Sequence, residues 1–192
     1  MRSNREKIMK SAVEQLSTYK SVHLNRKNIR THFVGVPMII WSIALLLASF
    51  SFEIEPAFIG NSLGIDHVNF TMAGILSVGV LIYYLILSVP LGILAFVLFG
   101  PLMWSVHYVV NMEYHIIIAI SIFVIGWVIQ FIGHHYEKAK PAFMDDINQL
   151  LIGPLFVIAE IYFLLGRGKV LDKNITEKAV LKRREFERKK AQ

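Results

Sequence analysis

The residues best suited to chemistry lie where an apolar stretch of the sequence ends in polar side chains. Residues 126–146 read GWVIQFIGHHYEKAKPAFMDD, so His134, His135 and Glu137 directly follow an apolar run. On a helix, Gln130, His134 and Glu137 occupy positions i, i+4 and i+7 and share one face, whereas His135 points about 100° away. Imidazole nitrogen and carboxylate oxygen both bind divalent transition metals. This helix face is therefore a candidate ligand set.

The second half of such a site is expected in residues 19–35, which read YKSVHLNRKNIRTHFVG. His23 and His32 are nine residues apart and would lie on opposite faces of one continuous helix. A shared site therefore requires a break around residues 25–28, where asparagines provide turn-forming side chains. Asn28 and His32 then stand at i and i+4 of the following helix.

A structural role is the alternative for each of these residues, because single histidines and charged pairs at helix ends are most often caps or interfacial side chains. We prefer that interpretation for four histidines: His67, His107, His115 and His135. Ionisable groups at membrane depth are costly and are candidates for function. For His134 with Glu137, the residues alone therefore leave a metal site and a helix-end role both open.

The composition places the chain in a membrane. Of its 192 residues 55% are hydrophobic, and all 20 Lys and Arg lie within residues 2–30 and 138–190. A net charge of +6 with a cation-free middle is typical of a membrane protein with charged ends and not of a nucleic-acid-binding protein. Cysteine is absent, so a metal would have only histidine, carboxylate and backbone oxygen as ligands.

Hydropathy predicts an all-α fold, a polytopic membrane helical bundle with four transmembrane helices and a broken fifth apolar segment. The four spans, each near the roughly 20 residues that cross a bilayer, are residues 34–52, 72–87, 91–109 and 116–133. The fifth segment, residues 150–165, contains Gly153 and Pro154. We expect it to be broken, re-entrant or interfacial, with a full crossing as the alternative.

Charge sets the expected topology, since basic loops stay on the cytoplasmic side of a membrane. Four crossings place both termini and His134 in the cytoplasm, in an integral multi-pass protein of a bacterial inner membrane or the endoplasmic reticulum. We divide the chain into a membrane-embedded catalytic domain, residues 1–166, and a basic cytoplasmic tail, residues 167–192. The tail is expected to be solvated, with a helix on the membrane surface as the alternative.

Two blocks of the sequence carry a resemblance to a known family. The first block comprises Tyr19, His23, Asn28, His32, Gly35 and Pro37. The second comprises Gln130, Phe131, Gly133, His134, Glu137, Pro141 and Ala142, followed by GPLFVIAE at residues 153–160. These blocks resemble the 2-hydroxy fatty acid dioxygenases, small multi-spanning membrane proteins of fungi and bacteria. The resemblance covers about residues 19–166, although the middle of the chain matches only in hydropathy.

The resemblance implies an Fe(II)-dependent dioxygenase that performs α-oxidation, in which a 2-hydroxy fatty acid loses its carboxyl carbon and leaves as the acid one carbon shorter. The metal ligands that it implies are His23, His32 and His134. We expect Glu137 to be a fourth ligand or to fix a ligand ring. Gln130 and Asn28 are expected to orient ligands or bound oxygen. Whether Glu137 or His135 ligates the metal directly is left open.

The expected partners are a 2-hydroxy fatty acid, O2 and the lipid bilayer, and a homo-oligomer is left open. Four basic residues are candidates for holding the substrate carboxylate at the headgroup level: Lys27, Arg30, Lys138 and Lys140. A catalyst for this substrate belongs at a helix end, because the reactive carbon of a lipid acid lies at the water boundary while its tail lies in hydrocarbon.

Other classes of membrane protein fit less well. Membrane di-iron hydroxylases carry many histidines in HxxxH and HxxHH boxes, and this chain has only the pair His134 and His135. Two axial histidines of a haem protein would lie in mid-membrane rather than at helix ends. The non-enzymatic alternative is a small transporter or scaffold with a structural metal site, which predicts polar residues at the bilayer midplane. The second to fourth spans offer only serines there.

Overall fold

The structure is a computed structural model, and it describes residues 2–54, 68–137 and 148–190. The helices are α1 (Arg2–Ser21), α2 (Arg26–Ala48), α4 (Met72–Leu87), α5 (Val89–Val109), α6 (His115–Glu137), α7 (Gln149–Leu164) and α8 (Lys169–Lys190), and the strands are β1 (Ser51–Ile54) and β2 (Val68–Thr71). The predicted all-α class is thus confirmed, with one short β-ribbon added to it.

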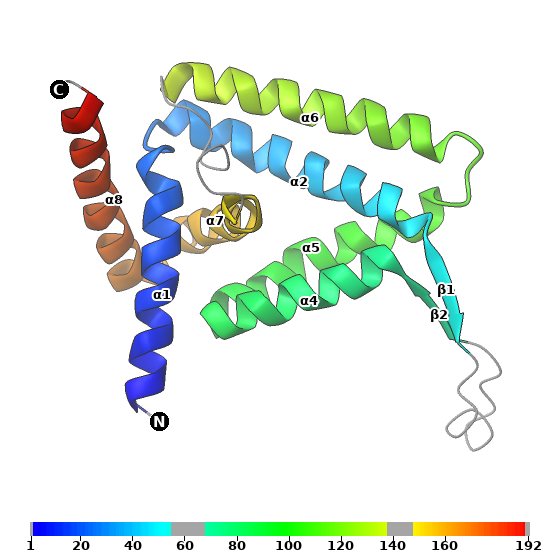
Figure 1. The fold of residues 1–192 in the computed structure, drawn as a ribbon, viewed down its shortest axis with the longest axis horizontal. Helices are drawn as coiled ribbons and strands as arrows, with labels where there is room; N and C mark the ends of the chain where they lie inside the picture. Colours follow the sequence, from blue (N-terminus) through cyan, green and yellow to red (C-terminus); the bar gives the residue numbers. More distant parts are fainter. Residues whose placement is uncertain (1, 55–67, 138–147, 191–192) are drawn as a thin grey trace.

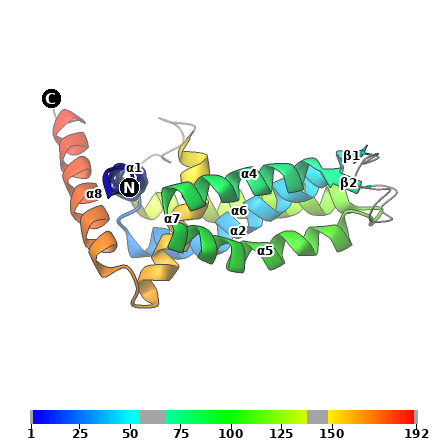
Figure 2. The ribbon, with the colours of Figure 1, turned by 90° about the horizontal axis from the view of Figure 1, so that it is seen from below.

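The apolar helices form a bundle of two layers, in which α2 lies beside α6 and α4 lies beside α5 (Figure 1). Turning the molecule shows the same four helices running in one general direction (Figure 2). Helices α2, α5 and α6 are long and apolar enough to cross a membrane, whereas α4 has 16 residues. At 1.5 Å per residue α4 spans about 24 Å, which is less than the roughly 30 Å of a hydrocarbon core. Three of the four predicted spans therefore have the expected length.

Helices α2 and α6 approach each other closely because glycines lie at their contact. A Cβ on Gly133 would overlap Oγ1 of Thr31, and a Cβ on Gly126 would lie 3.2 Å from the carbonyl oxygen of Gly35. A Cβ on Gly35 would meet the amide nitrogen of Gln130 at 2.7 Å. Larger residues at these positions would push the two helices apart. The glycines therefore let side chains from α2 and α6 meet at a common site.

Helix α7 lies across the end of the bundle. Figure 1 shows it nearly end-on, while α2 and α6 run across the view. Its residues Ile152, Leu155 and Phe156 are almost fully buried, in a core cluster that includes side chains from α1, α4 and α5. The helix continues through Gly153 and Pro154, so the break that we predicted there is wrong. Pro154 lies inside the helix, where a proline removes one backbone hydrogen bond and crowds the carbonyl four residues before it. The burial of Leu155 and Phe156 beside it offsets this cost.

The polar helices α1 and α8 lie side by side at the same end of the molecule as α7 (Figures 1 and 2). Glu14 of α1 forms ion pairs with Lys178 and Lys182 of α8. Ile175 and Ala179 of α8 are 1% and 0% exposed. The C-terminal segment is therefore a helix packed against α1 and not the solvated tail that we expected.

The two strands lie at the opposite end of the bundle (Figure 1). They pair antiparallel, with Ser51 opposite Thr71 and Ile54 opposite Val68. Thr71 also caps α4, because its side chain accepts a hydrogen bond from the backbone N–H of Gly74. These residues lie at and between the first two predicted spans, and no strand was predicted there. Residues 55–67, which include His67, lie outside the described residues.

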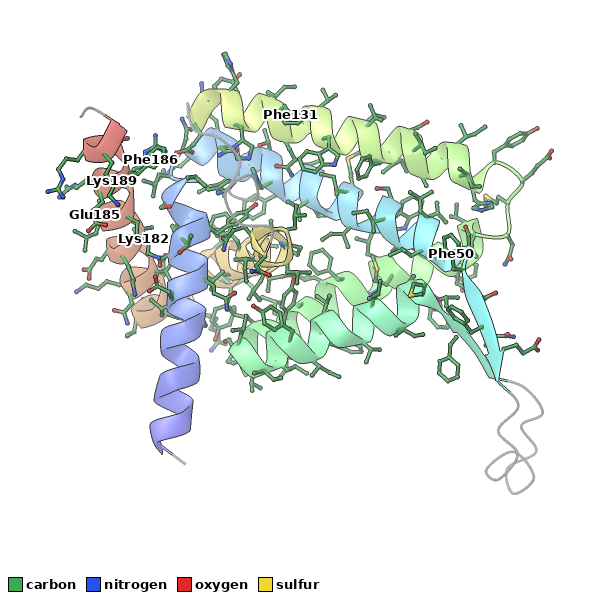
Figure 3. All side chains as sticks on the ribbon, viewed as in Figure 1. Phe50, Phe131, Lys182, Glu185, Phe186 and Lys189 are labelled. Atoms are coloured by element: carbon green, nitrogen blue, oxygen red, sulfur yellow. The ribbon has the colours of Figure 1, made fainter. Side chains whose placement is uncertain are left out.

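Outward-facing side chains distinguish the bundle from α8 (Figure 3). Phe131 on α6 and Phe50 just after α2 are 56% and 62% exposed, whereas α8 presents charged residues such as Glu185 and Lys189. Extensive exposed apolar surface is rare on soluble monomers and is expected where lipid surrounds a protein. The boundary between apolar and charged surface therefore falls between the bundle and the α1–α8 pair.

Candidate metal centre

The turn between α1 and α2 positions His23. Helix α1 ends at Ser21 and α2 begins at Arg26. Asn25 caps α2, because its side-chain oxygen accepts a hydrogen bond from the backbone N–H of Lys27 at 2.9 Å. The predicted break is thus present, but it covers residues 22–25 instead of 25–28. His23 consequently lies within the turn itself.

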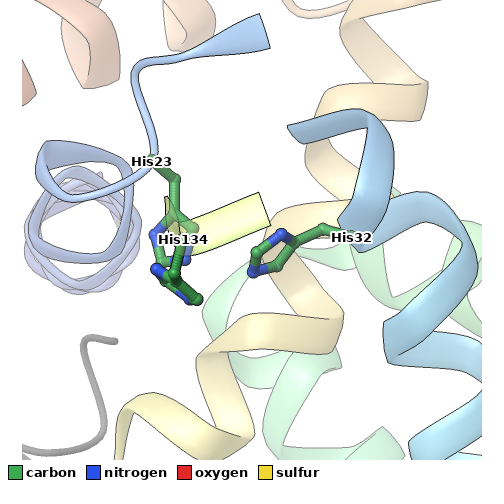
Figure 4. Close-up of side chains that lie close together, drawn as sticks. All are labelled: His23, His32 and His134. Atoms are coloured by element: carbon green, nitrogen blue, oxygen red, sulfur yellow. The ribbon is translucent and has the colours of Figure 1, made fainter. Parts of the chain in front are cut away.

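Three histidines from distant parts of the sequence meet at this end of the bundle (Figure 4). His23 comes from the turn, His32 from α2 and His134 from α6. Their ring centroids are 4.6 to 5.3 Å apart, and one nitrogen from each lies within 4.8 Å of the others. The side chains are 0%, 2% and 9% exposed, in the same order. The convergence that the sequence suggested is therefore present.

Backbone carbonyls fix two of these rings. Nδ1 of His23 lies 2.6 Å from the carbonyl oxygen of Tyr19, and Nδ1 of His32 lies 2.8 Å from that of Asn28. Because a carbonyl can only accept, each Nδ1 carries the proton and each Nε2 keeps its lone pair. Within the described part of the chain, Nε2 of His23 has no hydrogen-bond partner. A hydrogen-bonded Nδ1 with an available Nε2 is the usual state of a metal-binding histidine.

The electrostatic environment keeps the ring of His23 neutral. Burial lowers the pKa of His23 well below its usual range, and the neighbouring His32 and His134 lower it further. The hydrogen bond to the carbonyl of Tyr19 opposes these effects only in part. The Tyr19 ring also stacks on His23, with centroids 4.0 Å apart. His23 is therefore held in the neutral form that binds a metal.

The three nitrogens are close enough to converge on one metal ion. With imidazole bonds of about 2.1 Å, donors in a tetrahedral or octahedral site lie roughly 3.0–3.4 Å apart. The three nitrogens lie within 4.8 Å of one another, so binding would draw the rings together. Among the residues that the structure describes, no carboxylate or further histidine joins this group. Three protein ligands match catalytic sites, which keep positions open, whereas structural zinc sites use four.

Glu137 lies beside this group and not within it. Its two carboxylate oxygens accept hydrogen bonds from the backbone N–H groups of Leu24 and Asn25, at 3.1 and 2.8 Å. The side-chain amide of Asn28 lies 3.3 Å from the same carboxylate, and Nη1 of Arg183 lies 4.0 Å away. These contacts tie the turn that carries His23 to the end of α6. They favour a positioning role for Glu137 over direct ligation.

Asn28 and Gln130 face the histidines in different ways. Asn28 is fully buried, and its backbone carbonyl orients His32 while its side chain contacts Glu137. Gln130 lies one helical turn before His134 and is 4% exposed. Neither its amide oxygen nor its amide nitrogen has a hydrogen-bond partner among the described residues. The amide of Gln130 is therefore available to a ligand beside the histidines.

The histidines lie at one end of a cavity of about 700 Å³ between the two layers of the bundle. Tyr19 and Gln130 also line it, and α2, α4, α5 and α6 provide most of the remaining wall. Tyr19 was assigned no role from the sequence, although it stands four residues before His23, a spacing that brings side chains close together near a helix end. The site thus combines a polar end with a large apolar volume.

Of the four basic residues expected to hold a carboxylate, the two that the structure describes do not line this cavity. Lys27 and Arg30 are exposed on α2, and Nζ of Lys27 lies 5.0 Å from the ring centroid of Tyr136. Lys138 and Lys140 lie outside the described residues. Their assignment to substrate binding therefore remains a prediction.

The remaining described histidines lie away from the site. His135 is exposed on the outer face of α6. His107 stacks near Trp104, and His115 contacts Ser49 at the β-ribbon end of the bundle. The helix-end interpretation that we preferred for these three fits their positions.

Two comparisons with known proteins identify the family of this chain. The profile of the family described as 2-hydroxy-palmitic acid dioxygenase Mpo1-like matches residues 9–165, which include all three histidines and exclude α8. The chain is 32% identical over 155 residues to the 2-hydroxy-palmitic acid dioxygenase MPO1 of Saccharomyces cerevisiae, covering 79% of this chain and 80% of the yeast protein. No solved structure matches the chain. By the extent of both matches, the chain belongs to the Mpo1-like family of 2-hydroxy-palmitic acid dioxygenases.

Proposed function

We propose that this protein is an Fe(II)-dependent dioxygenase that converts 2-hydroxy fatty acids to the fatty acid one carbon shorter. The observation that carries the proposal is the group of three buried histidines at the polar end of an apolar cavity. The similarity to a yeast 2-hydroxy-palmitic acid dioxygenase supports the same reaction class. In the proposed reaction the substrate and O2 give the shortened acid, CO2 and one water. The substrate supplies all the electrons, so no organic co-substrate is needed.

The donor set suits the metal that this reaction needs. Fe(II) held by His23, His32 and His134 would supply a redox-active centre with open positions for the substrate and O2. The hydrogen bonds of Nδ1 in His23 and His32 leave their Nε2 atoms free to bind the metal, and one ring nitrogen of His134 completes the group. Glu137 would hold the His23 turn in place, and Gln130 would hydrogen-bond the oxygens of the bound hydroxy acid.

The apolar cavity contributes by excluding water from the reacting carbon. Its wall is mainly aliphatic and aromatic beyond the histidines, so the acyl chain displaces water on binding. A dry site also strengthens the hydrogen bonds that orient the substrate head. The Tyr19 ring, stacked on His23, closes the polar end of the cavity.

We place the iron at the cytoplasmic boundary of the membrane. The basic helices α1 and α8 lie at the histidine end of the bundle, and positive charge favours the cytoplasmic side. The direction of α7, across the bundle axis, supports an interfacial helix over a fifth crossing. The β-ribbon would then face the opposite compartment, with the protein integral and multi-pass.

A reconstitution assay tests the proposal. The protein is purified without metal under anaerobic conditions, loaded with Fe(II) and supplied with 2-hydroxypalmitate and O2, and the product is identified by mass spectrometry. We expect pentadecanoic acid, and we expect it to disappear with a chelator and in His134→Ala. His135→Ala provides the matched control, since this exposed neighbour lies outside the group and should retain turnover. Full turnover by His134→Ala would contradict the site.

The same assay separates the enzyme from a scaffold with a structural metal. A scaffold would bind one metal ion through the same histidines, lose stability when the ion is removed and turn over no hydroxy acid. Tight zinc binding together with absent turnover in the Fe(II)-loaded protein would favour that alternative.

A further inference from the structure

The cavity at the histidines continues far beyond them along the bundle. Its polar end contains the three histidines with Tyr19 and Gln130. Beyond the histidine end, the side chains of α2, α4 and α5 that line the cavity are almost entirely aliphatic and aromatic. Ser77 is the polar exception among them. A ligand that fills this space has a polar head at one end and a hydrocarbon tail.

The length of the cavity matches one extended acyl chain. On α2 its wall is a single helix face that runs from His32 through Val36 and Ile43 to Leu47. Fifteen residues separate the first from the last, which corresponds to about 22 Å. Half of a hydrocarbon core measures roughly 15 Å. The cavity is therefore long enough for a chain of the size found in membrane lipids.

The volume of the cavity is sufficient for a single chain. Spread over about 22 Å, the volume of about 700 Å³ leaves a cross-section of roughly 30 Å². One chain of carbon atoms, which pack at about 4 Å, fits within that cross-section.

Packed side chains close the far end of the cavity. Leu47, Ala73 and Met103 line it there. Ala73 belongs to a cluster of buried residues from α2, α4, α5 and α6. The indole N–H of Trp41 donates to Oγ of Ser105 at 2.8 Å, which ties α2 to α5 beside this cluster. The far end is thus a packed floor, with the small residue Ala73 at its surface.

We infer that this cavity measures the acyl chain of the substrate, with the acid head at the histidines and the methyl end at Leu47, Ala73 and Met103. These three residues determine the longest acyl chain that the cavity can enclose completely. The inference depends on the proposed function for the identity of the head group. Binding of the chain does not require turnover, so the two can be tested separately.

The test compares chain-length series between variants that change the floor. Ala73→Phe places a ring in the far end, and Met103→Ala enlarges it. Ile75→Phe is the matched control, because Ile75 lies on the same helix, is 49% exposed and does not line the cavity. Metal-free protein in nanodiscs is titrated with 2-hydroxylaurate, 2-hydroxypalmitate and 2-hydroxylignocerate against a fluorescent fatty acid. The Fe(II)-loaded protein is then assayed for turnover of the same acids.

In the wild type, affinity should rise about fourfold per added methylene and level off once the chain reaches the floor. Ala73→Phe should move this plateau to shorter acids and weaken the binding of 2-hydroxypalmitate at least tenfold relative to that of 2-hydroxylaurate. Met103→Ala should move the plateau to longer acids, and Ile75→Phe should leave it unchanged.

The inference is overturned if Ala73→Phe weakens all acids equally or leaves the length dependence unchanged. If Ala73→Phe does not fold, Met103→Ala provides the test, and an unchanged length dependence in that variant overturns the inference. Normal chain-length-dependent binding without any turnover would refute the proposed reaction and leave the cavity assignment standing. Turnover with no dependence on chain length would refute the cavity assignment alone.

Discussion

Replacing Glu137 by glutamine should weaken the metal site although it removes none of the three ligands. The carboxylate accepts hydrogen bonds from the backbone N–H groups of Leu24 and Asn25 at 3.1 and 2.8 Å. A glutamine keeps one acceptor and turns an NH2 group towards the other N–H, which leaves a buried donor unsatisfied. Losing one hydrogen bond to a charged group costs about 1.5–3 kcal/mol.

That cost falls on the turn that carries His23. If the whole of it opposes metal binding, affinity falls by roughly 10- to 100-fold, since about 1.4 kcal/mol corresponds to a factor of ten. Losses of about this size are typical when residues that orient metal ligands are changed. We therefore expect Glu137→Gln to bind Fe(II) or Zn(II) about 10- to 100-fold more weakly than the wild type.

Metal affinity is measured by competition with a chromophoric chelator, in detergent and under anaerobic conditions. Glu187→Gln is the matched control, because Glu187 is another carboxylate near Arg183 but is 59% exposed and remote from the turn. This control should bind metal as the wild type does. Unchanged metal affinity in Glu137→Gln would refute the view that this carboxylate positions His23.

Three further substitutions test how the surrounding elements hold the site. Gly133→Ala should lower the free energy of unfolding by about 1–3 kcal/mol and reduce the metal content, because its methyl group would overlap α2. Gly79→Ala is the control, since no atom lies near that position, and it should change neither the thermal melt nor the metal content. Lys20→Met should destabilise the protein by about 3–5 kcal/mol, since it leaves the partly buried Glu160 without its ion-pair partner at 2.7 Å, and Lys20→Met with Glu160→Leu should recover part of the loss. The α8 lysines lower the pKa of Glu14, so its stabilisation is complete above the unfolded pKa of about 4.3 and is lost as pH falls through the lower folded pKa. Because Glu14 is half exposed, its ion pairs should contribute less than about 1 kcal/mol to the free energy of unfolding. Glu14→Gln should therefore make the melting temperature slightly less dependent on pH in that range.

Elements bounded by clear signals could be predicted from the sequence. The span predicted at residues 72–87 coincides with α4, Met72–Leu87, because serine and proline interrupt the apolar run directly after it. A break between His23 and His32 could also be predicted as the condition for a shared site, since nine residues of continuous helix would have separated them. Both predictions depend on local geometry, which a single sequence constrains well.

The features that could not be predicted from the sequence depend on contacts between distant segments. Helix α8 contains so many charges that its narrow buried stripe, which includes Ile175 and Ala179, was not recognised as a packing surface. The unbroken course of α7 through Pro154 depends on support from the bundle that it crosses. Glu137 was expected either as a fourth ligand or as a residue that fixes a ligand ring, and the sequence did not decide between the two roles, because Leu24 and Asn25, whose N–H groups it accepts from, are distant in sequence.

Two kinds of force hold the ligands of this site. His32 and His134 stand on α2 and α6, whose separation is fixed by glycine contacts within the apolar bundle. His23 stands in a turn outside the bundle and is held by the carboxylate of Glu137 and by the attachment of α1 to α7 and α8, in which Lys20 pairs with Glu160 and Asp172. Polar contacts at a water boundary are weaker and more sensitive to ionic strength than packing in hydrocarbon. We therefore expect changes in these polar contacts to displace His23 before they displace His32 or His134.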